Sequence, residues 1–424
     1  MIKEKENIDQ LVDHLFRHES GKMIAVLTKI LGTENIDLAE DVVQDAMVEA
    51  INQWAYKGVP ENPKGWLYNV AKYKALNFLN REKIKQKYSL EVNHMLLSEQ
   101  GAEPAINDFF SEQEIADDQL RMMFTCCHPS ISADSQIALI LKTLCGFSIP
   151  EIAKAFLTNE ENINKRLVRA RQAIRENNID FEVPLGIEFS KRFDTILETI
   201  YLVFNEGYNS TTGNEIIRFE LCEEAIYLAQ LIADYPKITD KSRLYALLAL
   251  MLLNASRFNA RVNEHGEIID MAKQNRNVWN KDFIHKGIEY LNKSVESANV
   301  SKYQILATIS AHHCTATSDE TTDWKNILNL YQHLSALDSS PVVLLNKAIA
   351  VSKVMGYKQA IEELLLLKSN ALLNTYPHYY STIAELYLQQ NNKTEARFYF
   401  DKAISLSGNQ QEISYLNNKL GLCN

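Results

Sequence analysis

Residues that interrupt helices are scarce in this chain of 424 residues, which has only 14 glycines and 9 prolines. Both residue types destabilise helix interiors, and runs of β-branched residues that would indicate strands are few. The sequence therefore predicts an all-α fold. At about 100–200 residues per domain, the length allows two to four domains, each with its own hydrophobic core.

The N-terminal residues are charged and lead into no apolar segment, so no signal peptide is expected. No run of about 18 uncharged apolar residues is present, and no association with a membrane is expected. The cysteines are scattered and fit a reducing compartment better than a disulfide framework. They are Cys126, Cys127, Cys145, Cys222, Cys314 and Cys423. We therefore expect a cytoplasmic protein.

Two clusters of metal-ligating residue types, Cys126–His128 and His312–Cys314, lack the paired spacing of structural zinc sites. We expect neither a metal nor a cofactor. The sequence also has no nucleophile motif, no glycine-rich phosphate loop and no metalloprotease motif. An enzymatic function therefore has no support in the sequence.

The net charge of −10 is unusual for a protein that binds nucleic acid, but the charges are unevenly distributed. Basic residues gather at 72–87 and again at 165–175. Between them, residues 88–118 contain no Lys or Arg, and Gly101 and Pro104 would interrupt a helix there. That stretch has eight acidic residues, namely Glu91, Glu99, Glu103, Asp108, Glu112, Glu114, Asp117 and Asp118. The predicted parts are 1–87, an acidic linker at 88–118, 119–180, and a helical domain at 181–424.

The segment 62–81 is predicted to be an amphipathic helix, because Asn62 can cap it and Pro63 suits its first position. Its apolar side comprises Leu67, Ala71, Ala75 and Phe78. Its polar side has amides, an aromatic ring and cations, namely Asn69, Lys72, Tyr73, Asn80 and Lys83. Cations hold phosphates and aromatic rings stack on unpaired bases, so this face suits DNA that is being opened. A helix with a solvated lysine face has the same pattern.

The segment 147–171 has the pattern of a helix-turn-helix. Ser148 would cap the first helix, with Pro150 in its first turn, and Asn159 would cap the second. The second helix has a narrow apolar wedge of Ile163, Leu167, Ala170 and Ile174. Its other faces carry Asn164, Lys165, Arg169, Arg171, Gln172 and Arg175. Such a helix can read the major groove, although an ordinary helical hairpin is the alternative.

The C-terminal part shows internal repetition. The residues Tyr380, Ile383, Ala384, Tyr387, Ala396, Phe400 and Ala403 fit the spacing of tetratricopeptide (TPR) repeats. A looser match lies 36 residues earlier, at Leu344, Ala348, Val351, Ala360 and Leu364. TPR-like helix pairs are therefore predicted, and a helical array without a strict repeat is the alternative.

In order and separation, the two motifs resemble those of the extracytoplasmic-function RNA polymerase sigma factors of the sigma-70 class. Residues 37–50 resemble that family's polymerase-docking helix, 63–81 its −10 recognition and melting helix, and 151–175 its −35 helix-turn-helix. The likeness covers about residues 8–178, and 166–171 is its most diagnostic stretch. Four later stretches resemble a subgroup with a long TPR-containing extension, namely 123–129, 202–208, 274–279 and 341–348.

The resemblance implies that the chain binds core RNA polymerase, at its beta-prime clamp and beta flap, and directs it to promoter DNA. It places Asp41, Gln44 and Asp45 at the clamp, although they could also form a solvated acidic face. It implies contacts to the −10 element by Trp66, Asn69, Lys72, Tyr73, Asn77 and Arg81, with Trp66 alternatively part of the core. It implies contacts to the −35 element by Asn162, Lys165, Arg166, Arg169 and Arg171. The loop 54–61 would hold a flipped −10 base.

The subgroup further implies that the extension regulates activity, with a ligand or protein partner that is unknown. We hypothesise that the acidic linker and the extension restrain the two DNA-binding parts in the free protein. The stretch Asn205–Tyr208 could belong to a small-ligand pocket, or could form a helix-terminating turn with Gly207 just past the helix.

The helix-turn-helix departs from the family pattern, because Leu157 replaces the usual turn glycine and Asn162 and Asn164 replace common Thr and Lys residues. The promoter sequence therefore cannot be transferred from relatives. Two other functions stay open. One is a helix-turn-helix regulator that acts without polymerase, and the other is a TPR-type scaffold with a vestigial N-terminal part.

Overall fold

The computed structural model describes residues 2–82, 111–155, 158–184, 186–209, 217–236, 238, 240–264, 267–296, 300–370 and 373–423. Helices make up most of these residues. Their one β feature is an isolated antiparallel bridge between Val262 and Ile268. The predicted all-α fold is therefore confirmed. The chain divides into two compact units, Met1–Thr199 and Ile200–Asn424, which we describe separately.

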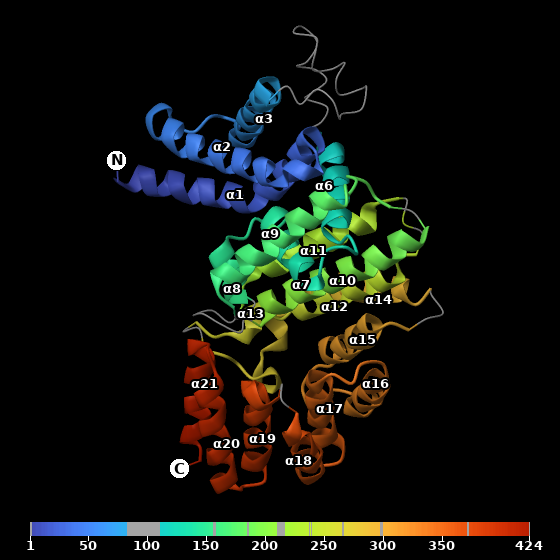
Figure 1. The fold of residues 1–424 in the computed structure, drawn as a ribbon. Helices are drawn as coiled ribbons and strands as arrows, with labels where there is room; N and C mark the ends of the chain where they lie inside the picture. The colour runs from blue at the N-terminus through green and yellow to red at the C-terminus, as the bar shows by residue number, and fades with distance from the viewer. Residues whose placement is uncertain are drawn as a thin grey trace. The chain divides into compact units, whose positions relative to one another are not determined.

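The first unit begins with three helices that pack together, shown in blue in Figure 1. They are α1 (Ile2–Leu31), α2 (Ile36–Lys57) and α3 (Pro63–Glu82), with the 3-10 turn η1 (Thr33–Asn35) between α1 and α2. As predicted, the Asn62 side chain caps α3 by accepting a hydrogen bond from the Gly65 amide at 2.9 Å. Leu27 of α1, Val43 of α2 and Leu67 of α3 are fully buried. The bundle core thus fixes which face of each helix is left for solvent.

Four further helices follow in the same unit, namely α6 (Glu112–Cys126), α7 (Ala133–Thr143), α8 (Ile149–Ala155) and α9 (Glu160–Glu176). Helix α6 begins at Glu112 because Ser111 accepts the Glu114 amide and Ile115 and Leu120 are buried. The predicted acidic linker therefore extends too far, since its last seven residues are helical. The remainder of the linker, except Ser111, lies outside the described residues.

The boundary between the two units falls within one helix, α10 (Gly186–Tyr208). Phe189 of α10 stacks on Phe124 of α6 at 5.3 Å between ring centroids, and Phe193 stacks on Phe189 at 5.2 Å. The first part of the predicted C-terminal domain, from 181, thus packs with the preceding helices. The helix ends at Tyr208, so Gly207 lies in its last turn rather than just past it, as the turn alternative had placed it. A Cβ there would come within 2.9 Å of the Arg218 carbonyl, so glycine permits a close approach.

The second unit is built around α12 (Ser242–Ala255), which is buried along nearly its whole length. Helices on several sides cover it, so its sequence is apolar all round rather than amphipathic. The surrounding elements are α11 (Phe219–Asp234), α13 (Phe258–Arg261), η2 (Met271–Lys273), η3 (Arg276–Val278), α14 (Lys281–Ser294) and α15 (Lys302–Thr315).

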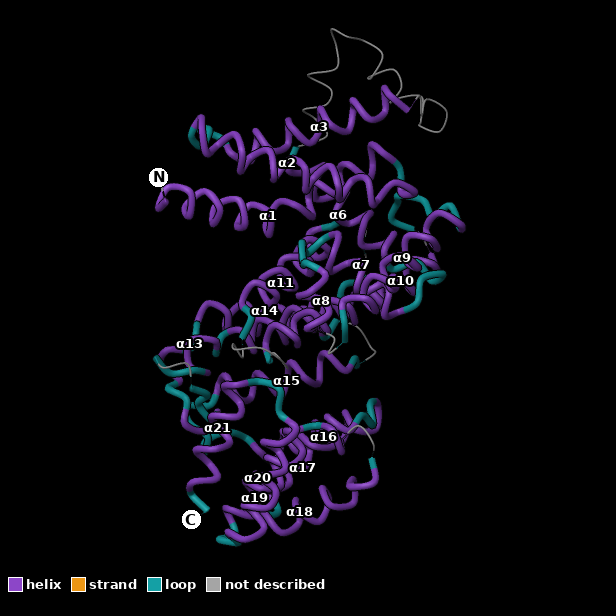
Figure 2. Tube along the Cα trace, turned by 60° about the vertical axis from the view of Figure 1, so that its left-hand side comes forward, coloured by secondary structure: helices purple, strands orange, loops and turns teal. Residues whose placement is uncertain are grey.

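The rest of the second unit is an array of helices that lie side by side in Figures 1 and 2. They are α16 (Trp324–Leu337), α17 (Pro341–Val354), α18 (Tyr357–Leu366), α19 (Pro377–Gln389), α20 (Lys393–Leu406) and α21 (Gln410–Gly421), with the short turns η4 (Leu367–Ser369) and η5 (Leu373–Thr375). The small residues predicted at helix crossings, Ala348, Ala384 and Ala396, are buried. The segments with repeat-like spacing are therefore the helix pairs α17–α18 and α19–α20.

No helix in the part of the chain that the structure describes is long and apolar enough to cross a membrane.

Candidate nucleic-acid interface

Helix α3 has the two faces that its sequence predicts. Leu67, Ala71 and Ala75 are buried against the bundle. On the other side Asn69 and Asn77 are exposed, and Tyr73 is 52% exposed. Amides and one aromatic ring are therefore available to a ligand along α3, without disturbance of the core.

Lys72 does not lie on this exposed face, contrary to prediction, because only 4% of it is exposed. It lies one turn after Tyr68, whose hydroxyl donates a hydrogen bond to Glu19 of α1 at 2.8 Å. The packed side of α3 is therefore wider than the apolar residues alone indicated. Trp66 is half-buried and contacts the buried Trp54 edge to face at 5.4 Å. The side chain of Arg81 lies outside the described residues.

The loop expected at 54–61 is shorter than predicted, because α2 continues to Lys57 and ends at Gly58, whose φ is 78°. Trp54 is a buried residue of that helix rather than a loop residue. Tyr56, in the last turn of α2, is 93% exposed and was missed as a candidate. It lies within the predicted loop 54–61, and its signal in the sequence was a large aromatic side chain next to Lys57.

Helix α2 has an exposed polar edge of Asp41, Gln44 and Asp45. Val43 and Met47 of the same helix are buried in the bundle. The three residues predicted for polymerase docking are thus presented together on one side of a rigid helix.

The helix-turn-helix consists of α8 and α9. Ser148 and Glu151 form reciprocal hydrogen bonds at the start of α8. Asn159 accepts the Asn162 amide at 2.8 Å and so caps α9, as predicted. The buried residues of α9 are the four of the predicted wedge, Ile163, Leu167, Ala170 and Ile174. Leu157 lies outside the described residues.

The polar side of α9 is only partly free. Asn162, Lys165 and Arg169 are exposed, although Lys165 pairs with Glu161 on its own helix at 2.7 Å. Arg166 forms an ion pair with Asp134 of α7 at 3.2 Å. The predicted −35 helix therefore offers fewer free cations than its sequence indicates.

The position of Arg171 differs most from the prediction, because its side chain contacts α2 instead of facing solvent. Its guanidinium donates to Glu40 Oε2 at 2.7 Å, and the two side chains are only 18% and 5% exposed. Burial raises the pKa of Glu40, although Arg171 opposes the shift. Arg175, one turn later, approaches Asp37 of α2 at 3.5 Å.

Further polar contacts join the same two groups of helices. Lys29 of α1 pairs with Glu114 at 2.7 Å and with Asp118 at 3.3 Å, both on α6. Arg17 of α1 pairs with Glu151 of α8. Burial raises the pKa of Asp118 to about 6, against the opposing effect of Lys29 and Arg121. Charged side chains thus lie inside the contact between α1–α3 and α6–α9 as well as at its edge.

The described residues contain no group of three or more His, Cys, Asp or Glu side chains that could hold a metal ion. Cys126 and Cys127 are fully buried, and burial raises the pKa of the Cys126 thiol to about 12. Both pack in the core, where the raised pKa of the Cys126 thiol disfavours the nucleophilic thiolate.

Comparisons with known families match this architecture. Residues 15–84, which span α2 and α3, match the family described as Sigma-70 region 2. Residues 121–174, which include the helix-turn-helix, match the family described as Sigma-70, region 4. The chain belongs to the sigma-70 family of RNA polymerase sigma factors.

This sigma factor has an additional segment, residues 192–295, that matches a family of unknown function (DUF6596). An uncharacterized protein of Rhizobium meliloti (strain 1021) is 34% identical over 387 residues, which cover 91% of this chain and 90% of that protein. The relationship therefore includes the C-terminal extension as well as regions 2 and 4. No solved structure shows significant similarity to the chain.

Membership in the family establishes the general role of the sigma factor in transcription initiation, which involves core RNA polymerase and promoter DNA. The match to region 2 covers α2, α3 and α1 from residue 15, and the match to region 4 covers the end of α6, α7, α8 and most of α9. The contact between Glu40 and Arg171 is therefore a contact between region 2 and region 4.

Proposed function

We propose that this protein is a sigma factor of the extracytoplasmic-function type whose C-terminal helical domain regulates promoter-specific initiation. Helix α2 docks on the beta-prime clamp through Asp41, Gln44 and Asp45. Helix α3 contacts the −10 element, and α9 contacts the −35 element. The observation that carries this proposal is Arg169, which is exposed on a capped helix whose opposite side is wholly buried. Such a cation can reach phosphates or guanine edges at little cost to the fold.

The form described here is a closed state. Elements near positions −35 and −10 lie about 25 base pairs apart, roughly 85 Å along B-form DNA. Arg171 of α9 is hydrogen-bonded to α2 at 2.7 Å, and α2 packs against α3. A straight duplex cannot present both elements to helices that lie this close together. Promoter recognition therefore requires regions 2 and 4 to separate, and the Arg171–Glu40 contact to break.

Regulation by the extension is supported by the course of α10. Its first half packs on region 4 through Phe189, which stacks on Phe124, and its last residues belong to the second unit. A change at the end of α10 can thus act on region 4 through a continuous helix. The acidic linker remains part of the hypothesis, although most of it lies outside the described residues.

Run-off transcription with purified core polymerase tests this function, on DNA from upstream of the protein's own operon. The full-length chain is expected to produce a specific transcript, and Arg169→Ala to reduce it about tenfold, as a lost base contact would. The control is Lys286→Ala, which removes an exposed cation from α14 of the second unit.

The same experiment separates the other two functions. A polymerase-independent regulator would bind the DNA without core enzyme and would tolerate Asp41→Lys, which reverses a charge on the exposed side of α2. A scaffold with a vestigial N-terminal part would give no transcript and would show no response to Arg169→Ala. Absence of transcription together with absence of core binding by gel filtration would refute the proposal.

A further inference from the structure

Two neighbouring arginines of the C-terminal extension lack the acidic partners that most other arginines of the described chain have. Arg257 follows α12 and Arg261 ends α13, and no carboxylate of the described residues lies within ion-pair distance of either. Elsewhere, ion pairs to carboxylates are made by Arg17, Arg121, Arg166, Arg171, Arg175, Arg192 and Arg218. Burying cations without counter-charges is unfavourable, so this pair requires an explanation.

The partners of the two guanidinium groups are all neutral. Arg257 donates to the Tyr208 hydroxyl and to Asn254 Oδ1, the latter at 3.2 Å, and touches the Met271 sulfur. Arg261 donates to the Tyr208 carbonyl and, at 3.4 Å, to Asn209 Oδ1. These contacts fix the positions of both cations but leave two positive charges uncompensated.

Aromatic rings hold both guanidinium groups in place. The Cζ atom of Arg261 lies 3.9 Å from the Tyr208 ring centroid. Arg257 lies 5.8 Å from the same ring and 5.9 Å from that of Trp279. Contact with aromatic faces orients each guanidinium plane, and Arg257 Nε has no hydrogen-bond partner in the structure. The arrangement is therefore preorganised for a planar or tetrahedral oxyanion.

These rings come from two sequence stretches that the sigma activity does not explain. Tyr208 ends the stretch 202–208, and Trp279 ends the stretch 274–279. The fold brings both to Arg257, within the segment that matches the family of unknown function. The ligand-pocket alternative for Asn205–Tyr208 thus gains structural support.

Several buried polar atoms around Arg257 also lack hydrogen-bond partners in the structure. They are Arg257 Nε, Gln274 Oε1, Trp279 Nε1 and His313 Nδ1. Burial, and then the neighbouring charges of Arg257 and Arg276, lower the pKa of His313 to about 3. Buried polar groups are usually satisfied, so the unpaired nitrogens of Arg257 and Trp279 indicate a missing acceptor, whereas Gln274 Oε1 would require a donor.

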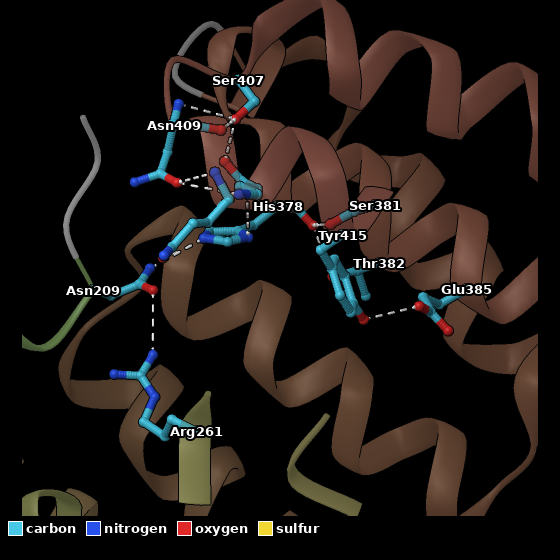
Figure 3. A network of polar contacts seen from close by, with 11 residues as sticks. Asn209, Arg261, His378, Ser381, Thr382, Glu385, Ser407, Asn409 and Tyr415 are labelled. Carbon is cyan, nitrogen blue, oxygen red and sulfur yellow. Dashed lines mark hydrogen bonds and ion pairs between the residues drawn. The ribbon is translucent and has the colours of Figure 1, made fainter. Parts of the chain in front are cut away.

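Two acidic residues close in sequence to this site have other partners. Glu206 pairs with Arg218 at 3.6 Å, and Asp270 with Lys419 at 2.9 Å. Figure 3 shows Arg261 directed to Asn209, which in turn meets His378 of α19, with 3.1 Å between Asn209 Nδ2 and His378 Nε2. His378 pairs with Glu412 at 3.2 Å. No acidic side chain of this polar network reaches the two arginines.

We propose that Arg257 and Arg261 form a binding site for the phosphate group of a small molecule, at the Tyr208 end of α10. Two guanidinium groups match a phosphate dianion, whereas a carboxylate would neutralise only one of them. The ligand is either free phosphate or a phosphate ester. Phosphate binding does not depend on the proposed sigma activity, and it can be measured without transcription.

Isothermal titration and thermal unfolding of the full-length protein test this site with inorganic phosphate, ribose 5-phosphate and AMP, and with acetate as the monoanion control. Binding of phosphate compounds should raise the midpoint of thermal unfolding. Tighter binding of the esters would identify an organic phosphate, and binding of inorganic phosphate alone would identify the free ion. Either outcome supports the site.

Arg261→Met should weaken phosphate binding at least tenfold and abolish the phosphate-dependent thermal shift, with helicity by circular dichroism retained. Arg261→Lys keeps the charge without the bidentate geometry and should give an intermediate loss, so the site remains testable if Arg261→Met fails to fold. The matched control is Arg397→Met, which changes an exposed arginine of α20. Equal binding of acetate, unchanged binding in folded Arg261→Met, or no binding of any phosphate compound at millimolar concentration would overturn the proposal.

Discussion

Helices α3 and α9 have similar sequence patterns but different surroundings in the folded chain. Both begin at an asparagine cap, and both bury an apolar stripe while carrying amides and cations elsewhere. On α3, Asn69, Tyr73 and Asn77 remain exposed. On α9, Arg171 instead contacts α2.

The difference shows that an amphipathic pattern identifies the buried side of a helix but not the use of its polar side. A polar side chain can face solvent, a ligand, or another part of the same chain. Arg169 and Arg171 lie two positions apart on α9, yet Arg169 is exposed and Arg171 is mostly covered. Experiments that change one arginine at a time can therefore separate contacts within the protein from contacts with DNA.

The largest effect is expected for Arg171→Ala. Its removal leaves the Glu40 carboxylate buried without its partner, which costs about 3 kcal/mol, or roughly a hundredfold in the local opening equilibrium. Hydrogen exchange of α2 and α9 amides should become faster by about that factor. Arg169→Ala removes an exposed side chain and should leave exchange nearly unchanged.

A second variant separates lost charge pairing from lost packing. Glu40→Gln combined with Arg171→Met removes both charges and should recover most of the protection, because no buried charge is left unpaired. If Arg171→Ala left exchange in α2 unchanged, the closed contact between regions 2 and 4 would not exist in solution.

A smaller effect is expected from pH, acting through Asp118 in the contact between α1 and α6. Its pKa is raised from 3.8 to about 6, so the folded state binds a proton more tightly than the unfolded chain does. Stability therefore falls as pH rises through this window, by about 2 kcal/mol between roughly pH 4 and pH 7. Hydrogen exchange of α6 at a series of pH values, corrected for the intrinsic rate, measures this slope.

Asp118→Asn removes the titrating group and should flatten the slope, whereas Asp117→Asn on the same helix should preserve it. A wild-type α6 whose protection rises steadily from pH 4 to pH 7 would contradict the raised pKa. That result would indicate that the charges of Lys29 and Arg121 affect the pKa of Asp118 more than its burial does.

Periodicity and capping predicted the N-terminal half of the fold well, because both depend on residues close in sequence. The asparagine caps at 62 and 159 and the buried wedge of α9 are of this kind. The failures involve partners distant in sequence. Lys72 is buried one turn after Tyr68, which bonds to Glu19 of α1, and Arg171 contacts Glu40, which lies 131 positions away. No local pattern encodes either contact.

The C-terminal domain shows the same limit. Helix pairs followed from the spacing of small residues such as Ala384 and Ala396, which are buried where helices cross. The role of Gly207 could not be predicted from the sequence. A glycine that follows periodic apolar residues indicates a helix end as readily as a close approach between helices. The cluster around Tyr208 and Trp279 was also inaccessible to sequence analysis, since the two stretches lie 71 positions apart.

The smallest effect concerns two aromatic residues of α3, and it tests whether exposure in the folded chain identifies the residue that contacts melted DNA. Tyr73 is 52% exposed, whereas Trp66 is half-buried against Trp54. Stacking of a base on an aromatic ring contributes about 1–3 kcal/mol, so Tyr73→Ala should reduce promoter opening about fivefold or more. Permanganate reactivity of −10 thymines in the complex with core polymerase measures opening directly.

Tyr73→Phe retains the ring and should open the promoter normally. Trp66→Phe should likewise have little effect on opening, since an aromatic side chain still packs on Trp54. If Trp66→Phe impaired opening while Tyr73→Ala did not, Trp66 would have to leave its contact with Trp54 to meet the DNA. The polar side of α3 would then resemble that of α9, because a packed residue of the closed form would become a DNA contact only after rearrangement.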